Sequence, residues 1–177
     1  MKEGVEEALD VLRQAMRNEI EGRTLYLEAI ERTEDRLGQR MFRSLATDEE
    51  EHQQILQAEY VKLEEEGKWL EAEAAQEVEL GPDLAIFPLE EEMVKKIIPP
   101  GATDLEALKL AMEFERRGYR LYESATAGNP DPTAQAVFRF LVQEESRHYA
   151  LLDNAYDYLA HKGIWYFDDL EKPFFEG

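Results

Sequence analysis

The chain has 177 residues, of which 44% are hydrophobic and 34% are charged, and it contains no cysteine. This composition suits a single globular domain with a substantial core, and the lack of thiols excludes disulfides, cysteine-based iron or zinc sites and thiol nucleophiles. The formal net charge of −20 opposes binding to nucleic acid or to an anionic membrane surface.

The first half of the sequence predicts two long helices. Apolar residues recur at steps of three and four over residues 4–33, which is the pattern of a helix with one buried face. A second helix is predicted over residues 36–66, because Gly67 is suited to the turn that follows a helix end. Residues 70–102 contain several prolines and glycines, so we expect this segment to cross over the bundle rather than to join it.

The second half predicts two more helices. Thr103 and Glu106 form a capping-box pattern at the start of the third helix. The fourth helix is predicted to begin near Asp131 and Pro132, because proline suits the first helical position, and to end before Gly163.

The two halves are related by an internal repeat. A shift of 96 residues aligns 12–69 with 108–165 without a gap, and 20 of the 58 aligned pairs are identical. Two duplicated helical hairpins joined by a long crossover predict an all-α, antiparallel four-helix bundle with ferritin-like connectivity. The predicted parts of this single domain (1–177) are the hairpins 4–69 and 103–165, the crossover 70–102 and a short tail 166–177.

Ionisable residues interrupt the apolar stripe of every predicted helix at one level. One Glu does so in the first and third helices, and a Glu and a His three residues apart do so in the second and fourth. Buried carboxylates are costly unless they are paired or coordinated. A Glu from each of two helices, with Glu-x-x-His from the other two, is an arrangement that holds two iron or manganese ions. The predicted metal ligands are Glu19, Glu49, His52, Glu115, Glu145 and His148.

Other residues near this level allow more than one interpretation. A bundle whose core carboxylates pair with basic residues is the main alternative to a metal site, and Arg23 is the main candidate for such pairing. Tyr26 and Tyr122 lie two turns from Glu19 and Glu115; either they hydrogen-bond to ligand carboxylates or they are core aromatics with satisfied hydroxyls.

Several further residues have simpler predicted roles. Trp69 and Trp165 end the two hairpins and are predicted to be packing anchors, and His161 is predicted to complement the dipole of the fourth helix rather than to bind metal. Most of the acids beside the two motifs are expected to face water. One of them is a candidate for a position next to the ligands or at the entrance to the site. These acids are Asp48, Glu50, Glu51 and Glu144.

The motifs together resemble the ferritin-like superfamily and, within it, the rubrerythrin-like di-iron proteins, over residues 12–66 and 103–162. The resemblance implies ligand roles for the six residues, with Glu49 and Glu145 bridging two ions. The chain departs from the family pattern in two respects. It has no cysteine for a rubredoxin-type site, and Gly118 stands one turn after Glu115, where rubrerythrins carry an extra carboxylate. Ferritins proper have a fifth helix that takes part in cage assembly. The tail after Gly163 is too short and too broken to form such a helix, so we do not expect a storage cage.

The leading functional hypothesis is a non-haem di-iron oxidoreductase that binds two iron ions, with manganese as an alternative metal. It would reduce hydrogen peroxide or dioxygen with electrons from a separate donor, such as a rubredoxin-like protein. The alternatives are an iron-binding, ferroxidase or iron-sensing protein without reductive turnover, and a purely structural bundle. With no apolar run long enough to span a membrane and no signal-peptide pattern, we expect a cytoplasmic protein. The resemblance to the rubrerythrin-like proteins implies a homodimer.

Overall fold

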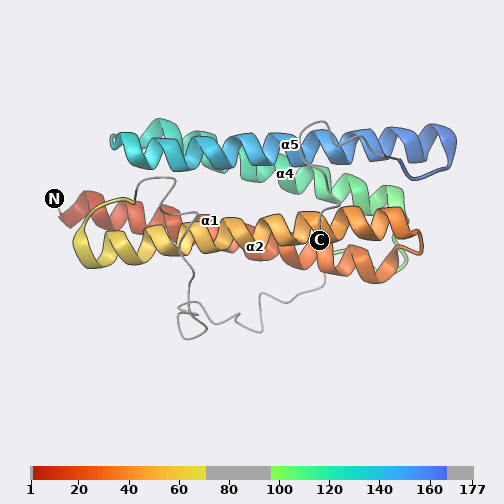
Figure 1. Cartoon of the computed structure of the whole chain (residues 1–177), viewed down its shortest axis with the longest axis horizontal. Coiled ribbons are helices and arrows are strands. Elements are labelled where there is room, and N and C mark those ends of the chain that lie inside the picture. The colour runs from red at the N-terminus through yellow and green to blue at the C-terminus, as the bar shows by residue number, and fades with distance from the viewer. Residues whose placement is uncertain (1, 71–96, 167–177) are drawn as a thin grey trace.

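The computed structural model describes residues 2–70 and 97–166, and these form an all-α four-helix bundle with no strand in the described ranges (Figure 1). The first hairpin consists of α1 (Lys2–Arg32) and α2 (Arg36–Glu66), and the second consists of α4 (Asp104–Gly128) and α5 (Pro132–Lys162). The predicted fold class is therefore confirmed. Most of the predicted crossover and tail, residues 71–96 and 167–177, lies outside the described residues.

The ends of α2 and α5 are fixed by repeat-related residues. Asp35 and Asp131 cap the N-termini of these helices, and each carboxylate accepts hydrogen bonds from two backbone N–H groups of the first turn. Gly67 and Gly163 follow the C-termini with φ of 65°, a left-handed conformation that costs glycine little. The predicted capping box is present at the start of α4. These caps set the length of the helices and thereby the level at which their central residues meet.

The apolar core is divided into two clusters. One is built around Tyr26 and Phe42, and the other around Tyr122 and Phe138. In every helix the motif residues fall between the segment that joins the first cluster and the segment that joins the second. The ionisable layer is therefore closed off from water along the bundle axis by apolar side chains on both sides.

The two tryptophans pack across the hairpins. Trp165 lies edge-on to Phe42 with ring centroids 5.8 Å apart, and Trp69 lies edge-on to Phe138 at 5.9 Å. Each tryptophan therefore anchors the end of its own hairpin against the core of the other, in agreement with the predicted packing role.

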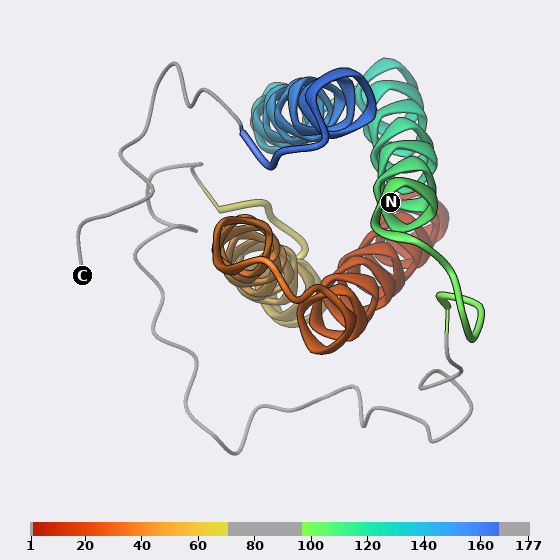
Figure 2. The same ribbon diagram turned by 90° about the vertical axis from the view of Figure 1, so that its right-hand side faces the viewer.

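The hairpins meet chiefly where α1 runs beside α4, as the end-on view shows (Figure 2). Within each hairpin the two helices pack along their length. No helix in the described part of the chain is long and apolar enough to cross a membrane.

Candidate metal centre

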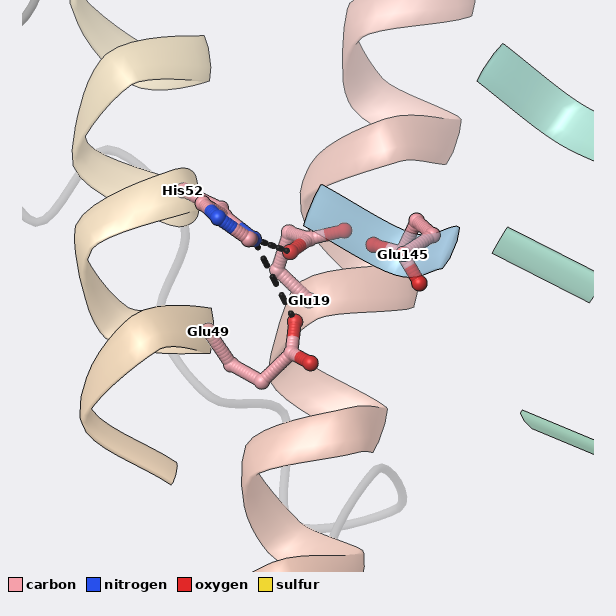
Figure 3. Close-up of side chains that lie close together, drawn as sticks. All are labelled: Glu19, Glu49, His52 and Glu145. Atoms are coloured by element: carbon pink, nitrogen blue, oxygen red, sulfur yellow. Dashed lines mark hydrogen bonds and ion pairs between the residues drawn. The ribbon is translucent and has the colours of Figure 1, made fainter. Parts of the chain in front are cut away.

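The six predicted ligand residues meet in one buried layer. The four glutamates have no exposed surface, and the two histidines are at most 2% exposed. Figure 3 shows Glu19, Glu49, His52 and Glu145 pointing toward one another from α1, α2 and α5. Residues that are far apart in the sequence thus converge at the centre of the bundle.

The layer contains two overlapping groups of potential ligand atoms, each within 4.8 Å of one another. Glu19, Glu49, His52 and Glu145 form one group, and Glu49, Glu115 and His148 form the other. Glu49 belongs to both groups, which is the position that a carboxylate bridging two ions requires. Glu145, the second bridge implied by the resemblance, belongs to the first group.

Many of the donor atoms in this layer have no hydrogen-bond partner within the described ranges. These atoms are the two carboxylate oxygens of Glu49, the two of Glu145, Oε2 of Glu115 and Nδ1 of His148. Leaving buried polar groups unsatisfied costs roughly 1–3 kcal/mol each and more for charged groups. Divalent cations would satisfy these atoms and neutralise the carboxylates, and the oxygen and imidazole donors suit Fe(II) or Mn(II). The donor set therefore fits the pair of ions that the sequence predicts.

The alternative of a core paired with basic residues has no support in the described part of the chain. No Arg or Lys there forms an ion pair with any of the six residues. Arg23, the predicted candidate for such pairing, contacts Glu50 instead, with Nη2 and Oε1 3.2 Å apart and both side chains partly exposed.

The two histidines present the same ring nitrogen to the cluster. Nδ1 of His52 lies 3.1 Å from Oε2 of Glu19 and 3.8 Å from Oε2 of Glu49. Nδ1 of His148 lies 3.4 Å from Oε1 of Glu49 and 3.5 Å from Oε2 of Glu115. The rings stack with centroids 5.6 Å apart. Nδ1 is therefore the atom that each imidazole offers to a metal ion.

The opposite nitrogen of each histidine faces an acid from the other hairpin. Nε2 of His148 lies 3.2 Å from Oδ2 of Asp48, and Nε2 of His52 lies 3.8 Å from Oε2 of Glu144. Arg147 contacts both acids, at 3.3 Å from Asp48 and 2.5 Å from Glu144. A carboxylate on the far nitrogen fixes the ring and its tautomer and makes the ligating nitrogen more basic. Sequence reasoning assigned these acids mostly to the solvent side, although their repeat-equivalent positions directly before the motif glutamates were a signal.

The two buried tyrosines also connect the hairpins. The hydroxyl of Tyr26 donates a hydrogen bond to Oε1 of Glu115, and that of Tyr122 donates to Oε1 of Glu19. Burial, together with the neighbouring carboxylates, raises the pKa of Tyr122 well above its usual value, so its hydroxyl keeps its proton. Each tyrosine therefore fixes one oxygen of a glutamate, and the second oxygen faces the cluster. There Oε2 of Glu115 has no hydrogen-bond partner in the described ranges, and Oε2 of Glu19 lies 3.1 Å from Nδ1 of His52.

The site holds protons in the absence of metal. Burial, assisted by the charge of Glu49, raises the pKa of Glu19 to about 8, and burial also raises the pKa of Glu145 well above its usual value. Burial alone would lower the pKa values of His52 and His148, but the surrounding carboxylates outweigh it and raise both. Burial opposes ionisation of Glu49, yet the nearby imidazoles of His148 and His52 lower its pKa. Metal binding must therefore displace protons from several ligands.

Glycines let the helices of each hairpin approach the carboxylates. A Cβ atom on Gly118 would lie 2.6 Å from Oε2 of Glu145. One on Gly22, at the equivalent position of the repeat, would lie 3.2 Å from the carboxylate carbon of Glu49 and 2.6 Å from a ring carbon of Phe114. The place one turn after Glu115, where rubrerythrins carry an extra carboxylate, is thus next to the carboxylate of Glu145 in this chain.

We predict that Gly118→Ala weakens metal binding by about tenfold or more, because overpacking of this kind typically costs about 1–3 kcal/mol and here displaces a ligand. Anaerobic titration with Fe(II) against a competing chelator measures the affinity. Gly4→Ala is the matched control, since no atom lies within 4 Å of a Cβ added at that helical glycine. Equal affinity of the Gly118→Ala variant and the parent would show that Glu145 is not a ligand.

The predicted helix-end histidine lies apart from the cluster. Nδ1 of His161 is 2.9 Å from the backbone oxygen of Asp157, and the side chain is exposed in the last turn of α5. It belongs to neither group of potential ligands.

A four-helix bundle with a buried layer of carboxylates and imidazoles contributed by all four helices defines a class, the helical-bundle carboxylate metal proteins. Residues 10–156 match the family model described as Rubrerythrin. The chain therefore belongs to the rubrerythrin family, which indicates a di-iron carboxylate protein and confirms the resemblance drawn from the sequence motifs. No curated protein and no solved structure matches the chain.

Proposed function

We propose that this protein is a peroxidase of the rubrerythrin type, which reduces hydrogen peroxide at a pair of iron ions held by the six buried residues. The reaction consumes two electrons and two protons for each peroxide and yields two molecules of water. The observation that carries the proposal is the sharing of Glu49 between two ligand groups. In the described part of the chain, both oxygens of Glu49 and of Glu145 and Oε2 of Glu115 are buried without a hydrogen-bond partner.

The bound iron pair would supply the electrons and the two adjacent positions at which the oxidant is reduced. The residues of the chain would hold and orient it. Glu19 and His52 would bind one ion, and Glu115 and His148 the other, with Glu49 between them. Glu145 would complete the cluster on the side of α5. The apolar clusters on both sides would exclude water, which strengthens electrostatic interactions within the site.

The sequence has no cysteine for a rubredoxin-type site. We therefore propose that electrons come from a separate donor, such as a rubredoxin-like protein, and that the protein acts in the cytoplasm as a homodimer. Dioxygen is the alternative oxidant, and manganese is the alternative metal.

A stopped-flow experiment on the anaerobically reduced, iron-loaded protein tests the proposal. We expect peroxide to oxidise the site faster than dioxygen does, and an added reductant to restore the reduced spectrum for many cycles. A single oxidation followed by retained ferric iron, with no further turnover, would instead support the iron-handling alternative. If no divalent metal binds under any loading condition, only a duplicated helical bundle remains.

A further inference from the structure

A cleft of about 380 Å³ lies between α4 and α5 at the level of the metal centre. Its wall includes Glu115 and Glu145, which also belong to the buried ligand layer. Its other residues include the exposed side chains of Arg116, Arg120 and Ser146, so the cleft leads from the surface to the carboxylates of the site. Because Glu115 and Glu145 themselves have no exposed surface, only a small molecule could pass between them by side-chain movement.

The lining of the cleft is suited to a small, polar, uncharged molecule. Tyr119, Ser146 and Tyr149 provide hydroxyl groups that both donate and accept hydrogen bonds. Arg116 and Arg120 line the same cleft. Their positive charges are balanced, because Arg116 pairs with Glu113 at 3.0 Å and Glu123 lies in the wall, so the outer cleft has no excess charge that would favour an ion over an uncharged molecule.

The first hairpin differs from the second at the equivalent place. The repeat aligns Tyr119 with Arg23 and Ser146 with Glu50. Arg23 and Glu50 form an ion pair 3.2 Å long that spans α1 and α2. Where the second hairpin has hydroxyl-bearing residues beside a cleft, the first has a contact that joins its two helices. The two halves have therefore diverged at the approach to the centre while retaining the same six ligand residues.

We propose that the α4–α5 cleft is the route by which hydrogen peroxide reaches the metal centre. This inference rests on the proposed peroxidase function and adds to it a side of approach.

The lack of cysteine allows a specific test. In a Ser146→Cys variant the only thiol of the protein lies in the cleft. A bulky alkyl methanethiosulfonate reacts with this thiol to form a mixed disulfide, which blocks the cleft and can be removed by reduction. The matched control is Gln53→Cys with the same label, because Gln53 is the repeat counterpart of Tyr149 and its replacement leaves the Arg23–Glu50 ion pair intact. Iron content by elemental mass spectrometry and the rate of peroxide oxidation are measured for each form.

We expect the label on the Ser146→Cys variant to slow oxidation by peroxide at least about tenfold, as blocking a route of access would. Iron content is expected to be unchanged, and removal of the label by a thiol reductant is expected to restore the parental rate. The labelled Gln53→Cys control is expected to oxidise like the parent.

Labelled Ser146→Cys protein that retains its iron and oxidises at the parental rate would overturn the inference while leaving the peroxidase proposal intact. Failure of the unlabelled parent to react with peroxide would overturn the proposed function, and this inference with it.

Discussion

Replacing Glu49 with alanine is expected to leave a folded bundle that no longer holds two metal ions. Glu49 is the one residue that belongs to both ligand groups. Its removal takes a ligand from each ion at once and leaves the remaining carboxylates to repel one another without a shared cation. We expect the iron content to fall from about two per chain to one or fewer, and the peroxide oxidation rate to fall by roughly 100-fold or more.

Elemental mass spectrometry and stopped-flow absorption measure these two effects. Glu51→Ala is the matched control, because it removes an exposed carboxylate from the same turn of α2 and should change neither quantity. A Glu49→Ala variant that kept two ions and turned over like the parent would place the reactive centre elsewhere in the molecule.

The thermal stability of the metal-free protein is expected to decrease as the pH rises from 5.5 to 8.5. The raised pKa of Glu19, about 8 against an ordinary 4.5, means that the folded state binds this proton more tightly than the unfolded chain does. The raised pKa values of Glu145, His52 and His148 act in the same direction. Stability that is complete at low pH is therefore lost as the pH rises through these folded-state values.

The lowered pKa of Glu49 has the opposite effect, but its contribution is lost only in acid, below its ordinary value of 4.5. Metal ions hold all these ligands deprotonated, so the gain in Tm on metal binding should increase with pH. At a free metal concentration 100 times the Kd, the gain should be roughly 5–10 °C for a chain of this length.

Differential scanning calorimetry of the metal-free and loaded forms between pH 5.5 and 8.5 measures this effect. His161 is the only histidine of the chain outside the site. The Glu19→Gln variant mimics a permanently protonated Glu19, so its metal-free form should show a flatter profile. A metal-free Tm that rises with pH would contradict the assignment of bound protons to the site.

The fold followed closely from local signals in the sequence. The second helix was predicted over 36–66, and α2 spans Arg36–Glu66. The first was predicted over 4–33, and α1 spans Lys2–Arg32. Caps explain this agreement, because Asp35, Gly67 and their counterparts mark helix ends by hydrogen bonding and backbone conformation within a few residues.

The location of the ligand layer was predictable for a related reason. A glutamate or histidine that interrupts an apolar helical stripe must be buried once the stripe is buried. The repeat then gave the same position twice. The structure brings all six residues together as the sequence indicated, while their role as ligands stays a prediction until metal content is measured.

Contacts between the two hairpins could not be predicted from the sequence. Asp48 and Glu144 occupy positions that helical periodicity assigns to the edge of the buried face, and only the relative position of α2 and α5 brings them to the histidines. The direction of the tyrosine hydrogen bonds is likewise set by packing, since each hydroxyl reaches the glutamate of the other hairpin and not of its own.

The crossed pairs of tyrosine and glutamate also bear on how such a chain arose. Tyr26 contacts Glu115 as Tyr122 contacts Glu19, which is the reciprocal pattern of an interface between identical subunits. A half-length ancestor carrying one hairpin would have built the complete six-residue layer by pairing with a second copy of itself. Fusion of the two copies then freed each half to change alone. The ion pair at Arg23 and the hydroxyl-lined cleft at Tyr119 are differences that only a fused chain could acquire.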